Sequence, residues 1–221
     1  MRFTLPSLLL SILFGALFLV TSFIRYKNKY KVTYNVRNMF PYELNYKSPF
    51  AENFYGNVSL ILAILSSCVF FFTFDLKFDN GFFIMIFISG IISSILFIAI
   101  AFIPLDFIRL HSALFILYMI FSFLLPTSIS IGSYVYNQQI GGSSPIPFII
   151  FIIAFIITLV TMVLLLNPKL TLNLRMKEEI APDGSIKYVR PNIITMAFTE
   201  WLLFFFLFAN EILVFVLSLA F

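Results

Sequence analysis

Two glutamates in an otherwise uncharged apolar segment are the residues whose chemistry most needs an explanation. Glu200 and Glu211 are the only charged side chains between positions 193 and 221. Eleven positions are about 1,100° of helical rotation, within about 20° of three full turns, so both carboxyls are expected on one helix face. Thr199 and Asn210 precede them at the same spacing and complete an intramembrane polar stripe. Ionisable groups in a bilayer are costly, which makes such positions functional candidates.

Two interpretations of this stripe stay open. In the first, Glu200 and Glu211 line an ion or proton path, or a polar groove for a lipid head group. In the second, Glu200 reaches the membrane interface and Glu211 bonds a neighbouring helix or a partner subunit. The second interpretation requires no ion path and no ligand, and it is the one we favour.

A second polar group stands at the expected start of the fourth helix. Asp106 is well placed to cap that helix, and Asp106 and Arg109 have the i,i+3 spacing of a helical ion pair. His111 follows about one turn deeper. Since the order of spans puts this helix end on the same side as Glu200, the geometry allows a cluster of all four residues beneath the first loop. Arg109 and His111 would suit a lipid phosphate. The alternative, which we favour, is a helix cap, an interfacial arginine and an internally bonded histidine.

The residue counts exclude most catalytic and metal sites. The chain has one histidine and one cysteine, Cys68, so an intrachain disulfide, a CxxC motif and a zinc site of nitrogen and sulfur ligands are not expected. Walker A, GxSxG, HExxH and dinucleotide-binding motifs are all missing. A hydrolase would have to use His111 with no identified nucleophile. We therefore predict no metal and no cofactor, and we favour a protein that is not an enzyme.

The composition places the chain in a membrane. Hydrophobic residues make up 61% of the 221 residues and charged residues only 11%, against about 25% in an ordinary soluble domain. A soluble fold of this size has too little interior to bury so much apolar surface. The net charge of +4 is concentrated in loops beside apolar segments, where basic residues have a topological role, so nucleic-acid binding is not expected.

Six segments are long enough to cross the hydrocarbon core, which takes about 20 apolar residues in a helix. The sequence therefore predicts an all-α membrane protein, one transmembrane domain over residues 1–221 with longer loops at 24–57 and 167–192. Pro126 is expected to end or kink the fourth helix, and Asn57 to cap the second. The predicted helices are 5–23, 58–74, 82–103, 107–126, 147–166 and 193–221.

The two longer loops carry strand signals. Residues 30–36 and 170–177 alternate between apolar and polar side chains, and Pro182-Asp183-Gly184 precedes a second short run at 186–189. With six spans these loops lie on the same side of the membrane. The sequence therefore predicts a hairpin in the fifth loop and a small β cap, built from 30–36 and 170–189, that joins both loops.

Basic residues are distributed unequally between the two sides. The side with the first, third and fifth loops has twelve lysines and arginines, whereas the side with both termini has Arg2 and Lys77. Cytoplasmic loops carry the excess of Lys and Arg. This count predicts that the first, third and fifth loops are cytoplasmic.

Two stretches resemble a known family. The segment Ser48-Pro49-Phe50-Ala51-Glu52, running into Asn57, is similar to the entry to helix two in six-helix bacterial and archaeal proteins related to the DRAM/Frag/Sfk-type membrane family. Phe102-Ile103-Pro104-Leu105-Asp106, followed by His111 and Phe115, resembles the signature of that group at helix four, although Ile103 interrupts its Phe-Pro pair. The resemblance covers about residues 1–130. It implies a lipid-related or membrane-organising role, and it places both termini inside, opposite to the charge count.

Three functions follow from these observations, in order of preference. The first is a multi-pass, non-catalytic membrane protein that binds lipids or a partner, alone or as an accessory subunit of a larger membrane complex. The second is a small transporter or channel that uses Glu200 and Glu211, although no internal repeat typical of transporters is seen. The third is a lipid-modifying enzyme centred on His111.

Overall fold

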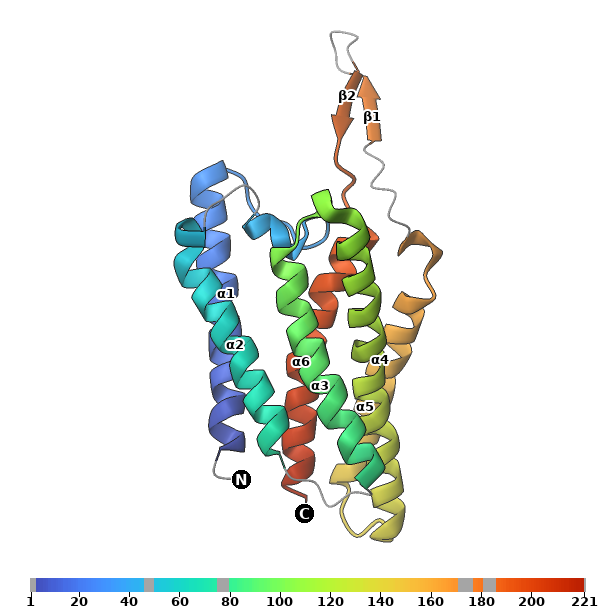
Figure 1. Cartoon of the computed structure of the whole chain (residues 1–221). Coiled ribbons are helices and arrows are strands. Elements are labelled where there is room, and N and C mark those ends of the chain that lie inside the picture. The colour runs from blue at the N-terminus through green and yellow to red at the C-terminus, as the bar shows by residue number, and fades with distance from the viewer. Residues whose placement is uncertain (1–2, 46–49, 75–79, 171–176, 181–185, 221) are drawn as a thin grey trace.

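Six long helices make up most of the chain in the computed structural model, which describes residues 3–45, 50–74, 80–170, 177–180 and 186–220. Each of the six is long and apolar enough to cross a membrane, which confirms a multi-pass integral membrane protein. Both termini lie at one end of the bundle, here called the terminal end, and the other is the loop end (Figure 1). The helices are α1 (Thr4–Tyr30), α2 (Phe54–Thr73), α3 (Asn80–Phe102), α4 (Ile108–Gln139), α5 (Ile146–Leu165) and α6 (Thr195–Ser218).

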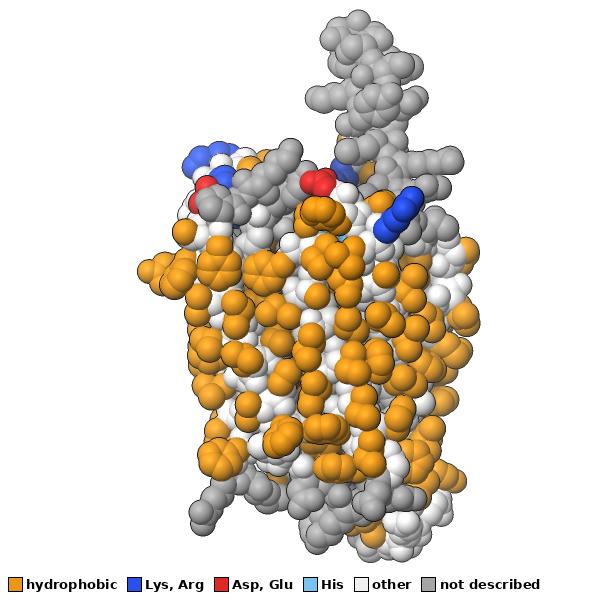
Figure 2. Space-filling view, viewed as in Figure 1, with side chains coloured by type: hydrophobic (Ala, Val, Ile, Leu, Met, Phe, Trp, Pro, Cys, Tyr) orange, Lys and Arg blue, Asp and Glu red, His pale blue; other side chains and the backbone are white. Residues whose placement is uncertain are grey.

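Helix α6 is the centre of the bundle. It contacts all five other helices, while α1 packs mainly on α2 and α4 packs on both α3 and α5. The apolar side chains of the outer helices cover the flank of the molecule, and charged side chains gather at the loop end (Figure 2). The one helix with two intramembrane carboxyls is therefore the helix most enclosed by protein.

A seam of small side chains lets α1 and α2 approach closely. All of its members are buried, and small residues at helix interfaces allow the close backbone approach that drives packing in lipid. The Thr4 hydroxyl donates to the Thr73 carbonyl at 2.9 Å near the terminal end, and Asn53 donates to Ser22 Oγ at 3.1 Å near the loop end. These two bonds set the antiparallel register. The small-residue seam consists of Ser7, Ser11 and Ser22 of α1 with Gly56, Ala63 and Ser67 of α2, and Gly15 of α1, beside it, faces Phe208 of α6.

Helices α4 and α2 are two of those that differ from their predicted bounds. Helix α4 runs through Pro126 to Gln139, beyond the predicted end at 126. Proline is tolerated inside membrane helices where hydroxyls and neighbours satisfy the backbone, and Thr127 Oγ1 donates to the Phe123 carbonyl at 2.7 Å. Helix α2 begins at Phe54 after Asn53, so Asn57 lies inside the helix and the prediction that it caps α2 was wrong.

The predicted β cap is wrong in its first-loop half. The described residues 31–36 contain no strand. Helix α1 continues to Tyr30, and Lys31 ends it in the left-handed conformation at φ 57°. The amide of Met39 then bonds the Asn35 carbonyl at 2.9 Å, which closes a turn instead of a strand ladder. A single 3-10 turn, η1 (Pro41–Leu44), follows, and another, η2 (Phe50–Asn53), leads into α2.

The fifth loop does contain a two-stranded antiparallel ribbon. Strand β1 (Lys177–Ile180) pairs with β2 (Ile186–Val189), and Lys177 stands opposite Val189. Its first strand begins seven residues later than the predicted run at 170, and residues 171–176 and the turn at 181–185 lie outside the described residues. Residues 46–49, with Ser48 and Pro49 of the family-like segment, lie outside them as well. The ribbon projects away from the bundle at the loop end (Figure 1).

Candidate functional site

A buried histidine–carboxyl pair links α4 to α6. His111 Nε2 lies 3.0 Å from Glu200 Oε1, and neither side chain has any exposed surface. On the other side of the ring, Nδ1 lies 2.6 Å from the carbonyl oxygen of Ile103, at the end of α3. Three helices thus converge on one imidazole. The second carboxyl oxygen of Glu200, Oε2, has no hydrogen-bond partner among the described residues.

The hydrogen bonds of His111 fix how many protons the pair holds. A carbonyl oxygen only accepts, so Nδ1 carries a hydrogen and donates it to Ile103. The contact with Glu200 then needs one more hydrogen, either on Nε2, which gives imidazolium and carboxylate, or on Oε1, which gives imidazole and carboxylic acid. Both arrangements contain the same proton. His111 and Glu200 therefore share one proton between α4 and α6.

The first loop closes over this pair. We call residues 31–45 the loop-one cap. The rings of Phe40 and Tyr42 meet the His111 ring edge-on, with centroids 6.1 and 5.7 Å away, and both are buried. Trp201, the only tryptophan in the chain, donates from Nε1 to the Met39 carbonyl at 2.9 Å. The cap therefore separates the pair from the loop-end surface.

Tyr34 anchors the loop-one cap from within. Its hydroxyl donates to the Phe40 carbonyl at 2.7 Å and lies 3.2 Å from the Trp201 indole nitrogen. Burial raises the pKa of Tyr34 well above its usual range, and the nearby Glu43 carboxylate adds to this rise. The hydroxyl therefore stays protonated and able to donate at neutral pH.

The loop-one cap also joins the segment that enters α6, as predicted for two loops on one side, but through side chains and single backbone bonds. The Ile194 amide donates to the Arg37 carbonyl at 2.9 Å, and Asn38 donates to the Pro191 carbonyl at 3.0 Å. Arg190 pairs with Glu43 at 2.8 Å. Burial acts to lower the pKa of Arg190, but the hydrogen bond and charge of Glu43 outweigh it and raise that pKa. The arginine is held as a cation.

Only two members of the predicted four-residue cluster come together. His111 and Glu200 are bonded and buried, whereas Asp106 and Arg109 are exposed and line a shallow depression at the start of α4. Asp106 lies in the 3-10 turn η3 (Leu105–Phe107), and the N-cap position of α4 belongs to Phe107, so the predicted Asp106 cap was wrong. Chain continuity places Asp106 five residues from His111, but the helix turns the imidazole inward.

The polar stripe of α6 is buried along its length. Thr199, Asn210 and Glu211 are as enclosed as Glu200. The Thr199 hydroxyl donates a hydrogen bond to the Thr195 carbonyl, 2.8 Å away in the same helix. Glu211 accepts a short hydrogen bond from Ser11 Oγ of α1, and the Asn210 Oδ1 atom has no partner among the described residues.

An aromatic layer separates the two carboxyls. On the face that Glu200 and Glu211 share, the intervening positions are Phe204 and Leu207, both buried. Phe204 stacks on Phe97 of α3 with centroids 4.3 Å apart, and Phe18 of α1 packs edge-on against Phe204 at 6.1 Å. Trp201 completes the layer against Phe18. A path that used both carboxyls would have to pass through these rings.

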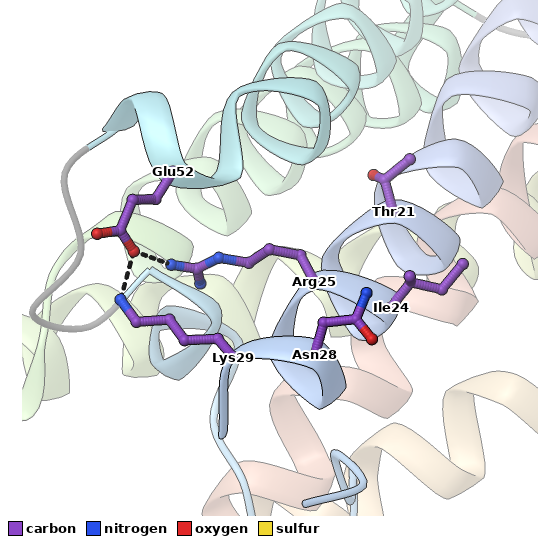
Figure 3. A pocket seen from close by; sticks show the side chains of 6 residues that line it. All are labelled: Thr21, Ile24, Arg25, Asn28, Lys29 and Glu52. Carbon is purple, nitrogen blue, oxygen red and sulfur yellow. Dashed lines mark hydrogen bonds and ion pairs between the residues drawn. The ribbon is translucent and has the colours of Figure 1, made fainter. Parts of the chain in front are cut away.

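A basic groove lies outside the bundle core, at the loop end of α1 (Figure 3). Arg25 and Lys29 point toward one carboxylate, Glu52 of η2, and Arg25 is 2.7 Å from it. Arg25 also donates to the Leu44 carbonyl of the loop-one cap at 2.6 Å. The groove has a volume of about 600 Å³ and is lined by Thr21, Ile24, Arg25, Asn28, Lys29 and Glu52.

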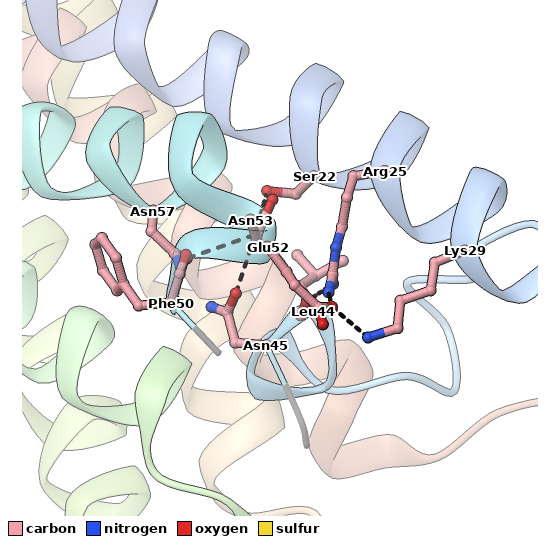
Figure 4. Close-up of polar contacts among 9 residues, drawn as sticks. All are labelled: Ser22, Arg25, Lys29, Leu44, Asn45, Phe50, Glu52, Asn53 and Asn57. Atoms are coloured by element: carbon pink, nitrogen blue, oxygen red, sulfur yellow. Dashed lines mark hydrogen bonds and ion pairs between the residues drawn. The ribbon is translucent and has the colours of Figure 1, made fainter. Parts of the chain in front are cut away.

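Buried amides hold the walls of this groove together (Figure 4). Asn53 donates to Ser22 at 3.1 Å and to Asn45 at 3.0 Å, which ties α1, the loop-one cap and α2 to one side chain. Asn57 donates to the Phe50 carbonyl at 3.2 Å. The basic groove and the contacts of Asn53 were not predicted from the sequence, in which Asn57 was expected only as a helix cap and the lysines and arginines were taken only as topology signals. The signal available was Arg25 and Lys29 at i,i+4 spacing just beyond an apolar span.

Comparisons with known proteins add no assignment. No family model, curated protein or solved structure matches the chain. The resemblance to the DRAM/Frag/Sfk-type family therefore stays a prediction from the residues.

Proposed function

We propose that this membrane protein binds the head group of an anionic lipid in the basic groove, without catalysing a reaction on it. The observation that carries the proposal is the convergence of Arg25 and Lys29 on a single carboxylate, in an open groove at the end of a membrane span. Among the described residues that line the groove, two cations face one carboxylate, Glu52. A lipid phosphate is the anion that is always present at this depth.

The shape and polarity of the groove suit a lipid. Ile24 is more than half exposed on the outer face of α1 and offers an apolar wall toward the hydrocarbon. Arg25 is the next residue and Lys29 lies about one turn further along the helix; both offer charged donors to phosphate oxygens, and Asn28 offers an amide. The acyl chains of one lipid would thus contact the apolar part of α1, and its phosphate would contact the basic part.

The distribution of charge supports an anionic lipid. With the loop end in the cytoplasm, as the excess of Lys and Arg predicts, the groove faces the leaflet that carries anionic lipids, where each Lys or Arg near the surface contributes about 1 kcal/mol of attraction. Lys27 and Lys31 are exposed beside the groove and add to this field.

The test is lipid retention by native mass spectrometry after extraction from membranes that contain neutral and anionic lipids. We expect the wild type to retain an anionic lipid, and Arg25→Gln/Lys29→Gln to lose it by about tenfold or more, since charge-assisted hydrogen bonds contribute about 1.5–3 kcal/mol each. The matched control is Lys27→Gln/Lys31→Gln, which removes the same charge from the same helix end but does not line the groove. Equal losses in both double variants would contradict a specific site.

A second variant guards against a misfolded groove. Glu52→Gln removes the carboxylate that competes with phosphate for Arg25 and Lys29, so retention of the anionic lipid is expected to rise. A gain of binding cannot come from misfolding. Unchanged or reduced retention in Glu52→Gln would count against the groove as a phosphate site.

A further inference from the structure

The carboxyl of Glu211 enters the small-residue seam between α1 and α2. Its Oε2 accepts a short hydrogen bond from Ser11 Oγ, and the register of the two helices brings Ser67 level with Ser11. The Ser67 hydroxyl is close to the same carboxyl, although among the described residues neither Ser67 Oγ nor Glu211 Oε1 makes a hydrogen bond of regular geometry. All three side chains are fully buried. Four oxygens of three helices thus lie close together at one buried point, and two of them have no hydrogen-bond partner among the described residues.

No cation in the described part of the chain pairs with this carboxyl. The ion pairs of the described residues all lie at the loop end, on Glu43, Glu52 and Glu200. Helices α3 and α5 contain no ionisable side chain. From α2, the Cys68 thiol lies within electrostatic range of Glu211.

The remaining ionisable groups of the described helices stand elsewhere. Those of α1 are confined to residues 25–30 at the loop end, and Tyr55 lies in the first turn of α2 at the same end. On α4, Arg109 and His111 lie at the loop end, Tyr118 lies within range of Glu200, and Tyr134 and Tyr136 follow Pro126 toward the terminal end. On α6 the other acid is Glu200, about 16 Å away along the helix axis and beyond the aromatic layer.

A bare carboxylate in this setting is not tenable. Burial of an unpaired charge costs far more than burial of a neutral group, and intramembrane carboxyls therefore pair with a cation or take up a proton. Carboxylate and hydroxyl oxygens are hard ligands of the kind that bind small cations, and hydroxyls bond a carboxylic acid equally well. Both possible occupants, a proton and a small metal cation, are single monovalent cations.

We propose that Glu211, Ser11 and Ser67 form a buried site that exchanges one monovalent cation, a proton or a sodium ion, from the terminal end of the bundle. The aromatic layer of Phe18, Phe97, Trp201 and Phe204 blocks passage toward the loop end. The site therefore binds a cation from one side and does not by itself conduct it. This inference does not depend on the lipid groove, which lies at the opposite end of α1.

The experiment follows thermal unfolding of the purified protein in detergent through the fluorescence of Trp201, the only tryptophan. Melting temperature is measured from about pH 5 to 9, in sodium chloride and in choline chloride at equal ionic strength. A ligand that binds the folded state raises the melting temperature with its concentration. If the cation is sodium, the wild type melts a few degrees higher in sodium than in choline. If it is a proton, the melting temperature falls as pH rises, in both salts.

The variants assign the response to the site. Glu211→Gln is expected to abolish the sodium response or remove that part of the pH slope, whereas Glu200→Gln, on the same helix face, is expected to retain it. Ser67→Ala keeps the carboxyl but removes one hydroxyl, so it is expected to shift the sodium response to about tenfold higher concentration, for a loss of about 1.4 kcal/mol. A wild type whose profile against both pH and sodium coincides with that of Glu211→Gln would overturn the proposal.

Discussion

The two carboxyls of α6 occupy the same helix face and are equally buried, yet their hydrogen-bond partners differ. Glu200 meets an imidazole whose other nitrogen is fixed by the Ile103 carbonyl, so a proton carrier is built into the fold beside it. Among the described residues, Glu211 accepts a hydrogen bond from the Ser11 hydroxyl and pairs with no cation. The first is neutralised from within the chain, whereas the second depends on a cation from outside it.

The surroundings of the two carboxyls differ in the same sense. The loop-one cap closes over His111 and Glu200 through aromatic rings, the Trp201 indole and bonds to the segment before α6. Glu211 lies instead in a seam of small side chains where two helices meet. A buried pair that holds its own proton needs no contact with solvent. A site that exchanges a small cation needs polar hydroxyl groups beside it and little protein between it and solvent. The position of the residue in the bundle thus decides its chemistry more than its place in the stripe.

The largest effect is expected from removing the ring that divides the two sites. Phe204→Ala deletes a fully buried side chain and is expected to cost about 4 kcal/mol of unfolding free energy, in the range for large-to-small changes at buried aromatic positions. Equilibrium unfolding in mixed micelles, followed by Trp201 fluorescence, measures it. Phe205→Ala, at a neighbouring exposed position, is the control. Similar costs in both variants would show that the aromatic layer is no tighter than the lipid-facing surface.

The next effect tests whether Glu200 depends on His111, its partner within the chain. His111→Leu is expected to cost about 3 kcal/mol, because it leaves Glu200 buried without its partner. In the double variant His111→Leu/Glu200→Leu much of this loss is expected to return, since apolar replacement of both members of a buried pair is often neutral. Far-UV circular dichroism during detergent unfolding gives both values. A double variant no more stable than the single one would argue that other groups, and not the orphaned carboxyl, account for the loss.

A smaller effect is expected where α6 meets the seam near Glu211. A Cβ atom at Gly15 would stand 2.8 Å from Phe208 Cζ, so Gly15→Ala is expected to cost about 2 kcal/mol by overpacking. The same substitution at Gly81, where a Cβ meets nothing within 4 Å, is the control. Sodium or pH dependence of the melting temperature, measured in the same samples, reports whether the displaced α6 also disturbs Glu211. Equal stability of the two variants would mean that Phe208 moves without cost.

The smallest effect is expected at the edge of the sealed site. Trp201→Phe keeps an aromatic ring but removes the hydrogen bonds to Met39 and Tyr34, at a cost of about 1 kcal/mol. Hydrogen exchange of the loop-one cap, read by mass spectrometry, is expected to speed up over residues 31–45 and to stay unchanged in α2. Exchange that rises equally in α2 would indicate general loosening of the bundle.

Some of the site was predictable because it depends on local composition. The helical period alone placed Glu200 and Glu211 on one face, and the order of the spans placed His111 and Glu200 at the same end. The Asp106 and Arg109 predictions failed to join that pair because Arg109 and His111, two residues or about 200° apart, lie on opposite faces of α4, and the sequence does not say which face points inward. The basic groove was missed because its third wall, Glu52, comes from another helix entry.

The sequence by itself determined that this is a six-span membrane protein, because each span is a local run of apolar residues that only a bilayer can accommodate. Only the tertiary structure decided which buried polar groups meet. His111 and Glu200 are 89 residues apart and Ser11 and Glu211 are 200 apart. In lipid, where apolar side chains gain little by leaving their solvent, such pairings depend on close packing and hydrogen bonds between helices. Those are properties of the assembled bundle and of no single segment.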